Sequence, residues 1–196
     1  NPPQILLNKT FQLEGARTEV RAIAAQGDKI YLAVNSDYQQ CGLAQGNCSG
    51  DWIVVTDFQG SILSKFAVGN TATYALDGPS SITGLVIWQD SLFVTGDLVG
   101  SVNHYLEKWS LDGQLKSDPW QPENNGTTPL VDNLGGLYVV GTKYIPPGVI
   151  RPSQEFISVD KIDPNQLSGL GWFPVSDLFP WPSNYPKGVA SNSLGG

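Results

Sequence analysis

The chain has 196 residues, of which 40% are hydrophobic and only 15% are charged, and its net charge is −7. It contains no basic run, so neither a nucleic acid nor an anionic membrane surface is an expected partner. The longest apolar stretches, such as GLVIW at 84–88, fall far short of the roughly 20 residues that a membrane-inserted helix needs. Glycine (22) and proline (14) interrupt the chain at short intervals, which disfavours long helices and predicts a packed, turn-rich protein.

The first segment, residues 1–19, is predicted to be a leading strand. Its stretch ILLNKTFQLEG at 5–15 is similar to SILSKFAVGN at 61–70, which lies near the end of a later repeat. We therefore expect it to complete a preceding repeat. The chain begins with Asn1 and contains no methionine, so we expect a processed or fragmentary chain.

A repeated phrase organises the rest of the chain. It reads GDKIYLAVN at 27–35, QDSLFVTGD at 89–97 and GGLYVVGTK at 135–143. The equivalent aliphatic positions are Ile30, Leu92 and Leu137, each followed by an aromatic residue at Tyr31, Phe93 and Tyr138. Aromatic and β-branched residues that recur in this way indicate a strand in every repeat.

Further strands are expected on both sides of each phrase. After it, a polar turn separates two apolar runs and predicts a hairpin, at 51–66, 104–120 and 155–173. Before it, a strand is expected at 20–28, 83–90 and 127–136. The Ala-rich stretch 14–27 could instead form a short helix, but its match to the equivalent stretch of the next repeat favours a strand. Each repeat is thus predicted to hold four antiparallel strands.

These repeats predict an all-β, β-propeller-like chain of about three complete blades with flanking strands. The expected blades span 20–78, 79–126 and 127–186. Residues 187–196 are expected to begin a truncated next blade, because KGVASNSLGG is similar to TPLVDNLGG at 128–136. Four-stranded units of ~40–50 residues are typical of propellers, in which stacked blades bury the faces that a single sheet leaves open.

The repeats also resemble a known group of propellers. GGLYVVGTKY with EFISVDKIDPNQL, and DSLFVTGD with LEKWSLDGQL, are similar to the bacterial propeller repeats of the SBBP and delta-60 type. The resemblance covers residues 20–173, although the first copy has Val34 and Asn35 where the family has a glycine. NHL, kelch and quinoprotein blades share the same skeleton. The resemblance implies a propeller fold and an extracellular setting, and it implies no common reaction.

The cysteines and the acceptor sequences for N-glycosylation indicate a compartment. Cys41 and Cys48 lie close together in CGLAQGNC and are expected to close a small disulfide loop, the alternative being two reduced thiols. Three stretches match the glycosylation pattern, at Asn8, Asn47 and Asn125. With the low charge content, these features predict a glycoprotein that is secreted or lies at the cell surface.

No catalytic motif is present, and no catalytic residue is assigned. Asp57, Asp112 and Asp163 fall at the predicted turns, where aspartate caps its own backbone. His104 is the only histidine and lacks the neighbours that nucleophilic catalysis needs, so a catalytic role is the minor interpretation. No cofactor or metal is expected, except that a loop Ca²⁺ could bind at Asp37 or Asp97.

Aromatic residues gather in a proline-rich stretch, GWFPVSDLFPWPSNYP at 171–186. The candidate ligand-binding residues are Trp172, Phe179, Trp181 and Tyr185, together with Trp120, which holds the equivalent place one repeat earlier. Such rings could stack on a sugar or bind a protein partner. The alternative, favoured by the recurrence at Trp120, is that the rings cover the apolar edge between blades.

Three functions are compatible with these features. The first is an extracellular, non-enzymatic propeller segment that serves as a structural module or binds protein or glycan. The second is a fragment of a larger propeller enzyme of the quinoprotein or glycoside hydrolase type. The third is a subunit that assembles by strand addition, with the remaining blades of the same chain or other copies as its partners.

Overall fold

The computed structural model describes residues 18–36, 51–69, 80–98, 104–121, 125–132, 134–145 and 154–174. These residues form β-strands and turns and contain no helix. It follows that no helix in the described part of the chain is long and apolar enough to cross a membrane. The strands form three antiparallel sheets, two of them four-stranded, and no sheet closes on itself among these residues. The all-β, antiparallel prediction is therefore confirmed.

Each sheet is built from one contiguous stretch of the chain. The first sheet contains, in spatial order, β1 (Thr18–Gln26), β2 (Lys29–Ser36), β3 (Asp51–Asp57) and β4 (Ile62–Ala67). The second contains β5 (Ser80–Trp88), β6 (Ser91–Leu98) and β7 (His104–Ser110). The third contains β8 (Asn125–Val131), β9 (Leu137–Ile145), β10 (Gln154–Asp163) and β11 (Ser168–Pro174). Within each sheet, every strand pairs with the next one along the chain, which is the simplest antiparallel order.

The stretch that was expected to be the fourth strand of the second sheet pairs irregularly. It follows β7 through two isolated bridges, Leu106 with Trp120 and Trp109 with Leu115. The amide of Trp120 donates to the carbonyl of Leu106 at 2.9 Å, and the amide of Leu106 donates back to the carbonyl of Trp120 at 2.8 Å. Between the two bridges lies Pro119, which has no amide hydrogen to donate. The two bridges lie three positions apart on β7 but five positions apart on the following stretch, so extra residues shift the register and interrupt the ladder.

The alternative prediction of a short helix over residues 14–27 is wrong for the residues of this stretch that the structure describes. Residues 18–26 form β1, which pairs with β2 from Thr18–Ser36 to Gln26–Lys29. Ala22 and Ala24 pack against the core between the first and second sheets. The small alanines thus let β1 approach the neighbouring sheet closely, which accounts for an Ala-rich sequence in a strand.

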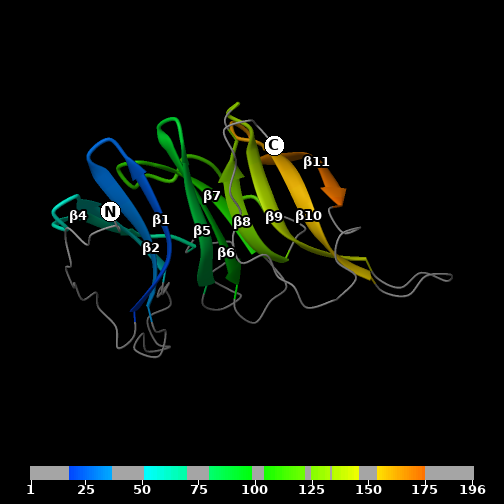
Figure 1. Ribbon diagram of the computed structural model, residues 1–196, viewed down its shortest axis with the longest axis horizontal. Coiled ribbons are helices and arrows are strands. Elements are labelled where there is room, and N and C mark those ends of the chain that lie inside the picture. Colours follow the sequence, from blue (N-terminus) through cyan, green and yellow to red (C-terminus); the bar gives the residue numbers. More distant parts are fainter. Residues whose placement is uncertain are drawn as a thin grey trace, which may run out of the picture.

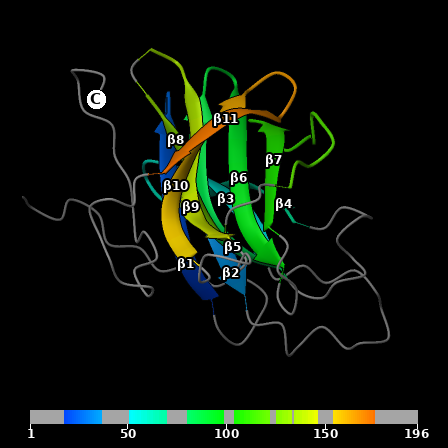
Figure 2. The same ribbon diagram turned by 90° about the vertical axis from the view of Figure 1, so that its right-hand side faces the viewer.

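The three sheets stack face to face in chain order (Figure 1). The first strands of the sheets, β1, β5 and β8, carry most of the contact between neighbouring sheets. Viewed along the stack, the sheets overlie one another with their strands running in similar directions (Figure 2). One apolar cluster, which includes Tyr31, Ile53 and Leu92, fills the space between the first two sheets. A second, which includes Phe93 and Leu137, fills the space between the second and third.

The repeated phrase gives equivalent residues the same direction in the stack. In β6, Leu92 belongs to the cluster toward the first sheet, whereas Phe93 belongs to the cluster toward the third. In β9, Leu137 faces back toward the second sheet. In β2, Tyr31 faces forward toward the second sheet, and Ile30 packs on the opposite face. The aliphatic residue of each phrase therefore faces backward, that is, toward the side of the preceding sheet. Because side chains alternate along a strand, the aromatic residue faces forward, toward the side of the following sheet.

Close approach between the second and third sheets depends on a small residue. An ideal Cβ built on Gly84 of β5 would lie 2.3 Å from Cδ of Pro129 in β8. A proline is compatible with β8 because this strand lies at the edge of its sheet and pairs only with β9. Gly84 and Pro129 together set the spacing of the two first strands.

Candidate functional site

A buried carboxylate, Glu107 of β7, links the first and second sheets. Its side chain is fully buried, and its Oε2 accepts hydrogen bonds from the amide of Gly69 at 3.0 Å and from Nε1 of Trp109 at 2.8 Å. Gly69 follows β4 of the first sheet, so the bond crosses between sheets. The other oxygen, Oε1, is buried and has no hydrogen-bond partner among the residues described.

A second buried carboxylate, Asp51 at the start of β3, lies in the same polar region. Its Oδ1 accepts a hydrogen bond from Nδ2 of Asn35 at 2.7 Å, and its Oδ2 accepts one from the Tyr105 hydroxyl at 3.5 Å. Both Asp51 and Tyr105 are fully buried. Since Tyr105 lies on β7, this contact also joins the first sheet to the second. We name Asn35, Asp51, Tyr105 and Glu107 the intersheet polar centre.

The electrostatics of this centre favour a neutral Glu107. Burial raises the pKa of its carboxyl above the ordinary value of 4.5, and the nearby charge of Asp51 raises it further. The hydrogen bonds from Gly69 and Trp109 act in the opposite direction. Burial is the largest of these effects, as expected where a charge is removed from water. Because the carboxyl has no access to solvent, its arrangement suits a structural link better than proton transfer to a substrate.

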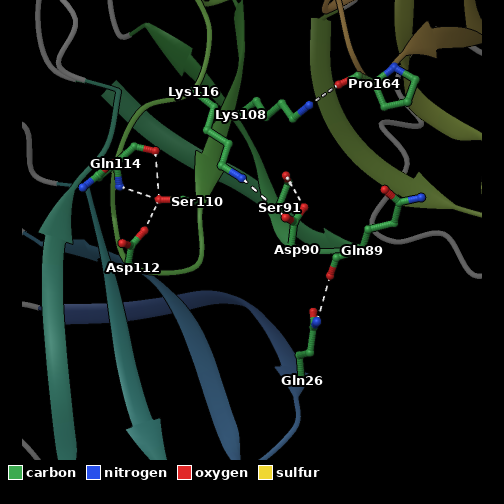
Figure 3. Close-up of polar contacts among 10 residues, drawn as sticks. All are labelled: Gln26, Gln89, Asp90, Ser91, Lys108, Ser110, Asp112, Gln114, Lys116 and Pro164. Carbon is green, nitrogen blue, oxygen red and sulfur yellow. Dashed lines mark hydrogen bonds and ion pairs between the residues drawn. The ribbon is translucent and has the colours of Figure 1, made fainter.

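The next residue, Lys108, makes the corresponding link in the forward direction. Its Nζ donates a hydrogen bond of 2.8 Å to the carbonyl oxygen of Pro164 in the β10–β11 turn (Figure 3). The same ammonium lies 5.7 Å from the centre of the Phe93 ring, which is within the range of a cation–π interaction. The dipeptide Glu107–Lys108 thus binds the preceding sheet with its first side chain and the following sheet with its second.

Other polar contacts line the end of the sheets at which the hairpin turns lie (Figure 3). Nε2 of Gln26, next to the β1–β2 turn, donates to the carbonyl of Gln89 in the β5–β6 turn at 2.8 Å. Within the second sheet, Nζ of Lys116 lies 3.8 Å from Oδ2 of Asp90. Ser110 bonds to Asp112 and to the amide of Gln114, which closes the turn after β7. This end of the molecule is therefore tied together by turn residues.

We expect Lys108→Met to lower the free energy of unfolding by about 1–2 kcal/mol. Methionine keeps the apolar stem but removes the charged donor, so the carbonyl of Pro164 loses its partner. Lys116→Met is the matched control, because among the described residues Lys116 forms an ion pair with the highly exposed Asp90 at 3.8 Å, and such surface pairs contribute little. Urea denaturation measures both variants, and equal effects would contradict the assigned role of Lys108.

The imidazole of His104 contacts a carboxylate at the end of the second sheet opposite the hairpin turns. Its Nδ1 lies 2.6 Å from Oδ1 of Asp97, and the two residues are cross-strand partners of β7 and β6. His104 is buried, while the Asp97 side chain is 36% exposed. Asp97 was a candidate for a loop Ca²⁺, and the structure places it beside this imidazole. Asp37, the other candidate, lies outside the described residues.

The structure describes only some of the aromatic residues that were predicted to bind a ligand. Trp120 is half-buried and packs against the cluster between the second and third sheets, with its ring near Gly169. The backbone of Trp172 lies in β11. The remaining three, Phe179, Trp181 and Tyr185, lie outside the described residues. Of these five side chains the structure describes only that of Trp120, and ligand binding by the rings stays a prediction.

The disulfide and glycosylation predictions fall mostly outside the part described. Four of the predicted residues lie outside the described residues, namely Cys41, Cys48, Asn8 and Asn47. Asn125 begins β8, where its backbone pairs with Thr142. These assignments stay predictions.

Neither a cluster of metal ligands among the described residues nor a match to a known protein points to a function. In the described stretches, no group of three or more His, Cys, Asp or Glu side chains is arranged to hold a metal ion. No protein-family model matches the chain, and no curated protein matches it significantly. The function must therefore be argued from the fold and from the contacts between its sheets.

Sequence reasoning missed the intersheet polar centre, although a signal for it was present. Glu107–Lys108 precedes the turn in the second repeat, and Asp160–Lys161 precedes it in the third. Both acids are buried, and the register with β6 and β9 places them at equivalent positions. The signal was this recurrence of an acid–lysine pair at one strand position, where the acid is buried in both sheets.

Proposed function

We propose that this chain is a segment of an extracellular β-propeller that acts as a structural or binding module. The observation that carries the proposal is the common direction of the repeats, with aliphatic residues facing backward and aromatic residues facing forward. Sheets that stack in one direction, with their first strands adjoining, have the arrangement of propeller blades. In this proposal, β1, β5 and β8 lie on the axial side of the stack.

The contacts between sheets support a scaffold role. Glu107 and Lys108 fix the second sheet to both neighbours, and the residues involved are buried or half-buried. Titratable side chains that bind a substrate need access to it, whereas the two carboxylates of the intersheet polar centre have none. Binding of protein or glycan is therefore assigned to the loops at the sheet ends, where function commonly resides on such scaffolds.

Electron microscopy of the protein in its natural length tests the blade assignment. The expected image is a disc in which these sheets are consecutive blades around a channel. A flat stack of sheets, or a sandwich of two sheets, would show that the assignment is wrong.

A glycan array and a hydrolysis panel test the binding role. The expected result is retention of a glycan or a protein ligand without release of products. Hydrolysis of a glycan, or absorbance of a quinone cofactor in the purified protein, would instead support the enzyme interpretation.

Intact mass spectrometry tests the compartment. A secreted glycoprotein is expected to lose mass on deglycosylation, and to gain the mass of two hydrogens when the bond between Cys41 and Cys48 is reduced. An unmodified chain with two free thiols would contradict secretion through an oxidising compartment.

A further inference from the structure

The outward face of the third sheet repeats a face that the second sheet uses for packing. On the second sheet, Phe93 and Lys108 are cross-strand partners, and both contact the third sheet. The partners in the equivalent positions of the third sheet are Tyr138 and Lys161. Their neighbours Leu137 and Ile162 pack toward the second sheet. Because side chains alternate along a strand, Tyr138 and Lys161 lie on the face that points away from it.

The residue of the second sheet that is equivalent to Lys161 is Lys108, which bonds to the next sheet. Lys108 is half-buried because the third sheet covers it and supplies the carbonyl oxygen of Pro164 as an acceptor. Lys161, in contrast, is exposed. The equivalence predicts that Lys161 also donates to a turn carbonyl when another sheet of this repeat covers the face.

The outward face of the first sheet offers such a turn. Phe58 directly follows Asp57 at the end of β3, just as Pro164 directly follows Asp163 at the end of β10. Phe58 is 53% exposed, and the nearby Ile62 is 44% exposed. Both belong to the end of the first sheet at which the hairpin turns lie.

The same end of the outward face carries a further exposed apolar residue. Ile23 of β1 is the cross-strand partner of Leu32, which packs on the face that points away from the second sheet. Ile23 is 65% exposed. Val34 and Val54, toward the other end of this face, are fully buried. Val20, the cross-strand partner of Val34, is 51% exposed, so this face is open along β1 as well as at the turn end.

We propose that a second copy of this chain docks the turn end of its first sheet onto the turn end of the third sheet, with Lys161 Nζ donating a hydrogen bond to the carbonyl oxygen of Phe58 of the partner subunit. The proposal rests on the proposed function, because it treats the sheets as units that stack in one direction. The contact joins two different faces, so it propagates head to tail or closes a ring. It is confined to the turn ends, and such small interfaces associate weakly.

Sedimentation velocity over a concentration series tests the docking. The wild-type protein is expected to self-associate as its concentration rises. Lys161→Glu should weaken this association by about tenfold or more, since the charged donor is replaced by a repelled carboxylate. Lys161→Met should weaken it as well, because it removes the donor without adding a charge. Lys29→Glu is the matched control, because Lys29 is exposed on β2 but lies outside both docking faces.

Mixing two variants tests the head-to-tail geometry. Ile23→Asp impairs the first-sheet face and Lys161→Glu impairs the third-sheet face, so each variant alone should remain monomeric. Mixed together, each supplies the face that the other lacks, and a 1:1 dimer should form without longer species. All the altered side chains are exposed, so circular dichroism should show an unchanged fold.

Two outcomes would overturn the proposal. The first is a wild-type protein that stays monomeric at every concentration up to the solubility limit. The second is self-association that Lys161→Glu and Lys29→Glu affect equally. Either result leaves the proposed function standing, because the electron-microscopy image reports the blade geometry independently.

Discussion

Gly96→Ala is expected to lower the free energy of unfolding by about 2–3 kcal/mol. An ideal Cβ on Gly96 would lie 2.3 Å from both Cζ and Oη of Tyr105. The two residues are cross-strand partners in β6 and β7, and the aromatic ring covers the glycine. Tyr105 is fully buried between the first and second sheets. The ring therefore has no free space into which it can move.

The matched control is Gly169→Ala in β11. There the nearest atom to an added Cβ is Cζ2 of Trp120 at 3.4 Å, an ordinary contact distance, and Gly169 is exposed. We expect a change of no more than about 0.5 kcal/mol. Urea denaturation curves of both variants give the comparison. Equal losses would show that the approach of Tyr105 to Gly96 is not tight in solution.

A double-mutant cycle separates this contact from a general weakness of β6. Tyr105→Leu removes the ring and opens space above residue 96. Gly96→Ala should then cost less in the Tyr105→Leu background than in the wild-type protein, because the added methyl group no longer meets the ring. An equal cost in both backgrounds would assign the effect to the backbone of β6 alone.

The sequence predicted the strands of the sheets well because the repeated pattern is local, but it did not predict which way the sheets face. Ile30 and Leu92 were aligned by their neighbours along the chain, and the alternation of a strand then determines which face each one occupies. The same reasoning failed to give the fourth strand of the second sheet its true form. The two bridged positions of that stretch lie five positions apart where their partners on β7 lie three apart, and this shift of register makes the pairing irregular.

The recurring charged pair singles out the position of Glu107, but its partners in the intersheet polar centre could not be predicted from the sequence. A glutamate in a strand ordinarily indicates a solvent-exposed position, and the flanking residues Leu106 and Lys108 do not reveal the partners of Glu107. Its burial depends on Gly69, which is 38 residues away in the chain, and on the indole of Trp109. The position of a donor at that separation follows from the stacking of whole sheets and not from any local pattern.

Glu107→Gln is expected to remove most of the dependence of stability on pH between about 4.5 and the raised pKa of the wild-type carboxyl. Because burial raises the pKa of Glu107 in the folded state above its ordinary value of 4.5, the folded state binds a proton more tightly than the unfolded state. The contribution of the protonated carboxyl is therefore fully present below pH 4.5. It is lost as the pH rises through the folded-state pKa.

Glutamine cannot ionise, yet its carbonyl oxygen can still accept hydrogen bonds from Gly69 and Trp109. The variant should consequently match the wild type at low pH and exceed it at pH 8, where folding of the wild type must either protonate this carboxyl or bury its charge. Glu107→Leu keeps the volume but leaves the amide of Gly69 and Nε1 of Trp109 without an acceptor, so we expect a loss of about 2–4 kcal/mol at every pH. Chemical denaturation from pH 4 to pH 8 measures all three proteins. A wild-type stability that rises with pH across this window, with the same slope in Glu107→Gln, would contradict the assignment. It would mean that ionisation of Glu107 does not contribute to the pH dependence of stability, whereas a rise that Glu107→Gln abolishes would mean that the carboxyl is stabilised as an anion.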